Sequence, residues 1–430
     1  MSGSDAPLEK GDTLQLNITA MAHGGEGIGH APDGRVVFVA GAVPGDRVAA
    51  TVGKAKKRWA RAQLADVVDA SPDRVEPACP AAARGAGCCD YSHIAPAAQL
   101  GLKRQVMLGQ LGAHTRSSGV LEGFDPAEEM TQRALEPGTG WRTRVRLGVD
   151  SAGRAGTRAA RSTELVTGAP CAQAAPGLLD GLVGEGARRF TPGAEVVAVL
   201  DGDGRRHIVE TTRAQRGRRV ERIDTVVEGG GEVVEHVLGH DFSFPATAFW
   251  QAHAAAPEAY AGLVEKWGAG DYERAVGWDL YGGVGVFVPF IAAALGGGRV
   301  ETVDYSPAAA ARPQEGLRDF DLGRHNRKVE AGVADLPAPG LVVLDPPRTG
   351  AGQEVIDAVA AAAPERVIHV GCDPATFARD LSSWGQRGYR VRRMELIDAF
   401  PGTHHFETVA LLEPAHSGPR GAVSAREGEV

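Results

Sequence analysis

The stretch that decides the fold is Trp278-Asp279-Leu280-Tyr281-Gly282-Gly283-Val284-Gly285. Its first four residues read as the end of a strand, the glycines as a turn, and the residues up to Leu295 as a helix. Glycines at such a turn let a ligand approach the backbone closely. The stretch therefore predicts a strand–turn–helix unit with a ligand site at the carboxyl end of the strand.

Further strands are expected around this unit, at residues 299–305, 341–345, 366–371, 389–397 and 406–412. Strands that alternate with helices are typical of an open α/β sheet, so residues 241–413 are predicted to form a Rossmann-like domain. Asp304 lies 19 residues after Gly285 at a strand end, where a carboxylate can accept both ribose hydroxyls. A nucleotide-like cofactor is therefore expected, with contacts from Asp279, Gly283, Gly285 and Asp304.

The chemistry of this turn distinguishes among cofactors. No Walker-type Lys-Ser/Thr pair follows the glycines, which argues against bound ATP phosphates. Asp279 suits a cationic amino-acid group better than a pyrophosphate. S-adenosylmethionine is therefore favoured over NAD.

Residues 10–70 read as short strands separated by glycine-rich turns, which predicts a small OB-like β-barrel. Its basic run surrounds Trp59, a combination that suits a phosphate backbone with a stacked base. The cations expected to bind RNA there are Lys56, Lys57, Arg58 and Arg61. A solvated hairpin is the alternative interpretation of this run.

The remaining segments are less regular. Residues 71–240 are predicted to form a small central α+β domain, with a cysteine-rich loop, a helix at 94–113 and short strands. Residues 414–430 are polar and are expected to be a disordered tail.

Composition limits the class of protein. The 430 residues carry a net charge of −8, which excludes a globally basic nucleic-acid binder but permits a local basic surface. The sequence has no apolar run of membrane-spanning length and no secretory signal at its start. Five cysteines, an odd number, favour thiols, metal ligands or a nucleophile over a disulfide framework, so a cytoplasmic protein is expected.

Three motifs place reactive groups near strand ends. Asp345-Pro346-Pro347-Arg348 predicts a rigid loop beside the cofactor, or a purely structural loop. Cys372 precedes a helix, where the helix dipole stabilises a thiolate; a buried core cysteine is the alternative. Glu407 enters an apolar strand, where burial raises a carboxyl pKa towards the range of a general base. A surface Glu or an ion-paired Glu is the alternative. His404 and His405 rank lower as candidates for the base.

Together these motifs resemble the S-adenosylmethionine-dependent RNA 5-methyluridine methyltransferases. Ala248-Phe249-Trp250-Gln251-Ala252-His253 is similar to the family's phenylalanine-x-glutamine motif, and the cofactor, Asp345, Cys372 and Glu407 motifs follow in family order. The barrel resembles the TRAM RNA-binding domain. The resemblance implies methylation of uracil C5 in ribosomal or transfer RNA, with Cys372 as nucleophile, Glu407 as base, and cofactor or substrate held by Gln251, Tyr281, Asp304 and Asp345.

That chemistry explains the residue types. A thiolate that adds to uracil C6 gives C5 carbanion character, so C5 can attack a methyl sulfonium. A base must then remove the C5 proton, and the target base must leave its stack to reach the pocket.

The resemblance also implies a four-iron–four-sulfur cluster, with Cys79, Cys88, Cys89 and Cys171 as its thiolates. The family pattern has two residues between the second and third ligands, whereas Cys88 and Cys89 are adjacent. Zinc on the same four residues and a loop with spare thiols are the alternatives.

Two other functions are weighed against this one. A catalytically inactive RNA-binding or assembly protein would keep the fold. A cytosine-5 RNA methyltransferase would need a cysteine in the motif that here reads Asp345-Pro346-Pro347, so uracil is favoured. No membrane and no obligate protein partner is expected.

Overall fold

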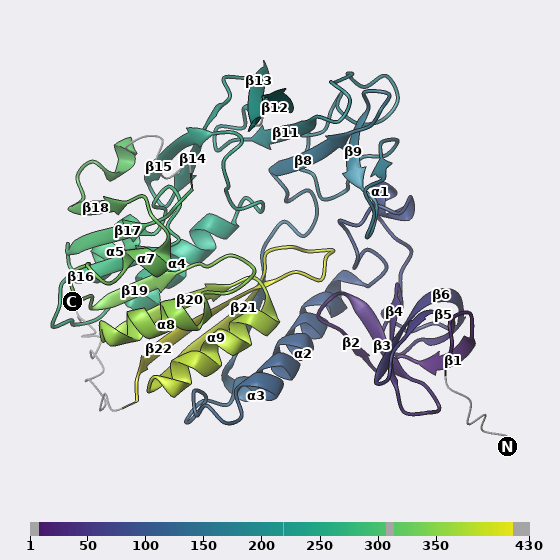
Figure 1. Cartoon of the computed structure of the whole chain (residues 1–430), viewed down its shortest axis with the longest axis horizontal. Helices are drawn as coiled ribbons and strands as arrows, with labels where there is room; N and C mark the ends of the chain where they lie inside the picture. The colour runs from purple at the N-terminus through teal and green to yellow at the C-terminus, as the bar shows by residue number, and fades with distance from the viewer. Residues whose placement is uncertain (1–7, 218, 307–313, 416–430) are drawn as a thin grey trace, which may run out of the picture.

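The computed structural model describes residues 8–217, 219–306 and 314–415, with the side chain of residue 216 excepted (Figure 1). Its largest sheet has eight strands in the order β18-β17-β16-β19-β20-β22-β21-β7. The neighbours from β18 to β20 run parallel, β22 runs antiparallel to both β20 and β21, and β7 runs parallel to β21. The strands are β7 (Thr131–Ala134), β16 (Val276–Leu280), β17 (Arg299–Val303), β18 (Leu322–His325), β19 (Leu341–Leu344), β20 (Arg366–Gly371), β21 (Tyr389–Asp398) and β22 (Glu407–Pro414).

Helices cover both faces of this sheet because its central strands are apolar on both sides. All four residues of β19 are fully buried; Val342 and Leu344 join one core, and Leu341 and Val343 join the other. The first core takes in residues of α2 (Pro96–His114), α7 (Val329–Gly332), α8 (Gly352–Ala361) and α9 (Pro374–Gln386), and the second takes in α4 (Ala256–Gly268) and α5 (Val288–Ala294). The predicted α/β class is confirmed.

A second, curled six-stranded sheet forms the N-terminal part of the chain (purple in Figure 1). Alternate residues of β4 and β5 are buried, so one face of each strand builds a separate core. Its strands are β1 (Thr13–Asn17), β2 (Ala20–Met21), β3 (Glu26–His30), β4 (Val36–Ala40), β5 (Arg47–Ala55) and β6 (Trp59–Asp69).

The middle of the chain holds another six-stranded sheet, a two-stranded hairpin and, among the described residues, two four-residue helices besides α2. The sheet order is β10-β9-β8-β11-β12-β13. These elements are β8 (Arg144–Val149), β9 (Ala155–Arg158), β10 (Leu165–Val166), β11 (Glu195–Leu200), β12 (Arg206–Arg216), β13 (Arg219–Glu228), β14 (Glu232–Val237), β15 (His240–Pro245), α1 (Pro80–Ala83) and α3 (Pro126–Glu129). A 3₁₀ turn, η1 (Glu315–Leu317), precedes β18 in the C-terminal part.

The three-part division into residues 10–70, 71–240 and 241–413 stays a prediction, but part of its middle segment packs elsewhere. Helix α2 lies against α9, and β7 pairs with β21 at the edge of the C-terminal sheet. The expected tail lies outside the described residues, apart from its first two residues. Pro414 is the last residue of β22, and Ala415 follows it. Among the described residues, no helix is long and apolar enough to cross a membrane.

Candidate active site

The glycine turn after β16 forms one wall of a small cavity of about 60 Å³. Asp304 fixes the turn, because its Oδ2 accepts a hydrogen bond from the Gly283 amide at 3.0 Å. Tyr281 has a φ of 62°, in the left-handed region that non-glycine residues rarely occupy, and such backbone strain is concentrated at functional sites. The cavity is lined by Phe249, Trp250, Gln251, Pro257, Tyr260, Tyr281, Gly282, Gly283, Val284, Val286, Phe287 and Asp345.

Asp279, near the end of β16, packs against this glycine turn. Its side chain is fully buried, its Oδ2 accepts a 3.4 Å hydrogen bond from Thr302, and its Oδ1 has no partner. A Cβ atom at Gly282 would collide with both Asp279 and Thr302, so only glycine fits there. Burial, Asp304 and Asp345 raise the pKa of Asp279 to about 7. Asp279 does not line the cavity, so its predicted cofactor contact stays a prediction.

The strand register brings Cys372 and Glu407 together. Gly371 at the end of β20 pairs with Thr408 of β22, so the next residue on one strand lies beside the preceding residue on the other. Asp345 follows β19, the parallel neighbour of β20, and its amide donates to the carbonyl of Leu280 beside the glycine turn. The side chains of Asp345, Cys372 and Glu407 therefore meet where β19 and β20 end and β22 begins, next to the cavity.

The electrostatics of these groups follow from burial. Glu407 is 4% exposed, and burial together with the charge of Asp345 raises its pKa well above the usual value. Within the described part of the chain, its Oε2 has no hydrogen-bond partner. Burial raises the pKa of Asp345 to about 7. Arg348 opposes the shifts of Glu407 and Cys372.

The thiol of Cys372 departs from the expectation based on the helix dipole. Burial, Glu407 and Asp345 raise the pKa of Cys372 to about 12 instead of lowering it. The N-terminus of α9 is already capped, since Asp373 accepts hydrogen bonds from the amides of Ala375 and Thr376. Two nearby carboxyl groups and desolvation thus dominate over the helix dipole.

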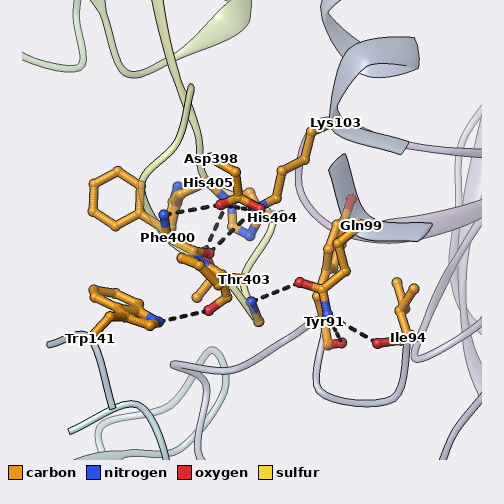
Figure 2. Close-up of polar contacts among 12 residues, drawn as sticks. Tyr91, Ile94, Gln99, Lys103, Trp141, Asp398, Phe400, Thr403, His404 and His405 are labelled. Carbon is orange, nitrogen blue, oxygen red and sulfur yellow. Dashed lines mark hydrogen bonds and ion pairs between the residues drawn. The ribbon is translucent and has the colours of Figure 1, made fainter. Parts of the chain in front are cut away.

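The loop that leads to Glu407 is anchored by a polar network (Figure 2). Lys103 of α2 donates to the Asp398 carboxylate at 2.6 Å and to the Phe400 carbonyl at 3.2 Å. Gln99 of α2 accepts from the Gly402 amide at 2.8 Å, and Trp141 donates to the Pro401 carbonyl at 3.2 Å. The position of the expected base is therefore fixed by residues some 300 positions earlier in the chain.

Two histidines connect the N-terminal sheet and the cysteine loop to the same region. His23, between β2 and β3, lies 2.8 Å from the Asp373 carboxylate, directly after Cys372. His404 forms an ion pair with Asp90, which follows Cys89. Three distant segments of the chain thus meet around the loop of Cys372.

A groove of about 1310 Å³ leads to this region. It lies among the N-terminal sheet, the middle sheet and the Phe249–Ala252 segment, and Phe249 is 77% exposed. Acidic residues in its lining are Glu26 and Asp90. The cations that line it are Lys54, Arg61, Arg142, Arg144, Arg146, Arg158 and Arg161.

The groove contains only one of the four cations predicted to bind RNA. Arg61 lines it, contacts the Trp59 ring, and pairs with Glu26 at 3.4 Å. Lys56, Lys57 and Arg58 are exposed at the tip of the β5–β6 hairpin, outside the lining.

Comparisons with known proteins agree with this geometry. The profile of the tRNA (Uracil-5-)-methyltransferase family matches residues 332–415, and the TRAM domain profile matches residues 7–65. A protein of Corynebacterium glutamicum named as an uncharacterized RNA methyltransferase is 48% identical over 411 residues, which cover 94% of this chain and 98% of that protein. The chain belongs to the uracil-5 RNA methyltransferase family. A relative from Streptomyces avermitilis with the same name is 35% identical, covering 95% of this chain and all of that protein.

The methyltransferase fold is confirmed by a solved structure. Pyrococcus abyssi tRNA (uracil-54, C5)-methyltransferase, in complex with S-adenosyl-L-homocysteine, superposes with a TM-score of 0.68 over 93% of this chain and 100% of that one, at 18% identity. The chain is thus an RNA methyltransferase with an N-terminal TRAM domain. At about 60 Å³ the cavity is smaller than a whole S-adenosylmethionine, but its lining supplies group types that would hold part of this cofactor: a glycine wall, apolar rings and the polar groups of Gln251 and Asp345.

The methyltransferase also gathers four thiols beside the groove. The Sγ atoms of Cys79, Cys89 and Cys171 all lie within 4.8 Å of one another. Cys88 lies 3.8 Å from both Cys171 and Cys89, and Cys89 lies 3.5 Å from Cys171. Hydrogen bonds from Cys171 and Cys89 lower the pKa of Cys88, whereas hydrogen bonds from Cys171, Cys79 and Cys88 together with burial raise the pKa of Cys89.

These spacings are compared with two kinds of metal centre. A tetrahedron with metal–sulfur bonds of about 2.3 Å has sulfur–sulfur edges of about 3.8 Å. In a four-iron cluster each thiolate binds its own iron, so the sulfurs lie farther apart. The sulfurs of Cys79, Cys89 and Cys171 are spaced closely enough for one tetrahedral ion, and Cys88 lies at 3.8 Å from two of these three sulfurs.

Several functional residues were not found by sequence reasoning. Tyr260, Lys103 and His23 carry no motif, and the groove arginines are scattered over some 100 residues. Arg348 belongs to the Asp345-Pro346-Pro347-Arg348 motif, which predicts a loop but no role for its guanidinium group. The one local pattern that marked the groove was the basic run around Trp59.

Proposed function

We propose that this methyltransferase transfers a methyl group to C5 of a uridine in ribosomal or transfer RNA, through a covalent bond between Cys372 and uracil C6. The observation that supports the proposal is the meeting of Cys372 and Glu407 on paired strands beside the cofactor cavity. S-adenosylmethionine supplies the methyl group as a sulfonium.

The residues have distinct roles in this proposal. The Cys372 thiol passes its proton to a neighbouring carboxylate, Asp345, and the resulting thiolate adds to C6 and gives C5 the electron density that it needs to attack the methyl group. Glu407, with its raised pKa, accepts the C5 proton, and loss of Cys372 then restores the aromatic ring. Gln251, Tyr281, Asp304 and Asp345 hold the cofactor or the target base.

The test traps the adduct. Cys372→Ser should abolish methyl transfer while RNA binding persists, and Glu407→Gln should accumulate a covalent RNA–protein complex on a denaturing gel. Glu413→Gln, at the other end of β22, is the matched control and should show normal turnover. Absence of a slow-migrating band with Glu407→Gln would exclude Glu407 as the base.

The RNA target is proposed to follow the basic groove into the active site. Seven groove cations and an exposed Phe249 suit a single strand whose bases stack on aromatic rings. Lys56, Lys57 and Arg58 would extend the path along the hairpin. Mass-spectrometric mapping of methylated uridines in cells with and without the gene identifies the target.

The cysteine quartet is proposed to bind metal. Its compact spacing supports one tetrahedral ion of the zinc class, whereas the family resemblance favours four irons. Metal and acid-labile sulfide analysis of anaerobically purified protein separates the two. One ion per chain without sulfide supports the first, and four irons with four sulfides support the second.

A further inference from the structure

Tyr260 of α4 has a hydroxyl group that the structure leaves without a partner. The residue is 1% exposed, and its OH finds no hydrogen-bond partner among the residues that the structure describes. The residue lines the cofactor cavity together with Gln251, Tyr281 and Asp345. A polar group that is buried without a partner is unfavourable, so this hydroxyl points to a partner that arrives with a ligand.

Two other tyrosines show the usual alternative. The hydroxyl of Tyr389, also buried, donates to the Pro364 carbonyl at 2.8 Å. The hydroxyl of Tyr272 donates to the Gly268 carbonyl. Each of these groups is satisfied within the fold, whereas that of Tyr260 is not.

The surroundings of Tyr260 are the reacting groups themselves. Burial and the charges of Glu407, Asp345 and Cys372 raise its pKa well above the usual value. The phenol therefore keeps its proton throughout the working pH range and acts as a neutral hydrogen-bond donor.

We propose that the Tyr260 hydroxyl donates a hydrogen bond to the C4 carbonyl oxygen, O4, of the target uracil. This inference rests on the proposed function. When the Cys372 sulfur forms its bond to C6, the C5=C6 π electrons shift towards C4, and negative charge develops on O4. The hydrogen bond strengthens at this point, since donors aimed at developing charge stabilise a transition state in a water-excluded site.

No proton leaves Tyr260 in this step. The electron pair returns to C5 to form the new carbon–carbon bond, the methyl–sulfur bond of the donor breaks, and the C5 proton passes to Glu407. Cytosine carries an amino group in place of O4; the Tyr260 oxygen can accept from that group, but the O–H group then has no acceptor on which negative charge develops.

The experiment compares Tyr260→Phe with Tyr389→Phe in the full-length enzyme. The assays are methyl transfer to RNA, the rate of covalent adduct formation with RNA that contains 5-fluorouridine, calorimetric affinity for S-adenosylmethionine, and thermal unfolding. Tyr260→Phe should lower kcat and the adduct rate about 10- to 100-fold. Its cofactor affinity should stay within about twofold and its Tm should not fall, because the hydroxyl has no partner in the fold.

Tyr389→Phe should give the opposite pattern, with a lower Tm and normal kinetics, since its hydroxyl bonds within the fold. An unchanged adduct rate in Tyr260→Phe would overturn the proposal. So would a loss of cofactor affinity that matches the loss of rate, because the hydroxyl would then contact the cofactor. Failure of the proposed function looks different: the wild-type enzyme forms no adduct, and Cys372→Ser still methylates RNA.

Discussion

The anchoring of the loop before Glu407 depends on a buried ion pair whose removal has a large expected effect. Lys103 and Asp398 lie 2.6 Å apart, and their side chains are 0% and 4% exposed. Lys103→Met would leave the Asp398 carboxylate buried without its cation, which destabilises a protein by about 3–5 kcal/mol. It would also remove the donor to the Phe400 carbonyl.

The chain provides a control ion pair with the same distance between the charged atoms but different burial. Arg47 and Asp69 also lie 2.6 Å apart, but their side chains are 51% and 66% exposed. Exposed pairs contribute about 0–1 kcal/mol, so Arg47→Met should have little effect. Burial, and not distance, accounts for the difference.

Hydrogen exchange measures the result locally. The amides of Phe400, Gly402 and Thr403 donate hydrogen bonds within this network, so their exchange reports opening of the loop. Lys103→Met should increase their exchange by roughly two to three and a half orders of magnitude, at about 1.4 kcal/mol per tenfold. Methyl transfer should fall with it, because Glu407 loses its fixed position.

The double variant Lys103→Met/Asp398→Asn tests the physical cause. It removes the unpaired charge and keeps an acceptor for the Phe400 amide, so it should recover much of the lost protection. If Lys103→Met changed exchange no more than Arg47→Met, a buried charge would not anchor the loop, and the reasoning would be wrong.

Three further predictions follow from the site. Because the pKa of Cys372 is about 12, its thiolate fraction should rise tenfold per pH unit from pH 7 to 9. The rate of iodoacetamide labelling of the Cys372 peptide should rise with the same slope. A plateau of the labelling rate below pH 9 would contradict the raised pKa. Gly282→Ala should reduce calorimetric S-adenosylmethionine affinity at least about tenfold, because the new Cβ collides with Asp279. Gly101→Ala, in helix α2, is the control and should bind normally, since its Cβ meets nothing within 4 Å and its φ is not positive. Arg158→Gln, in the groove, should lower the slope of log RNA affinity against log salt by about 1, whereas the Arg47→Met control should keep the wild-type slope.

Much of the fold could be read from local sequence patterns. Strand periodicity and glycine punctuation predicted the C-terminal α/β sheet, since both depend on neighbours in the sequence. The order of the Gln251, Asp279, Asp345, Cys372 and Glu407 motifs identified the family. The packing of α2 and β7 against that sheet was missed, because their partners lie more than 250 residues later.

The sequence by itself determined which chemistry is present: a thiol, a carboxylate and a cofactor turn, each marked by a short motif. Only the tertiary structure decided their working environment. The Cys372 pKa rises because the thiol is buried and because the fold brings Glu407 and Asp345 beside it, and helix α4 buries the Tyr260 hydroxyl without a partner among the described residues. Such effects arise from desolvation and from charges brought together across the chain, and no local pattern encodes them.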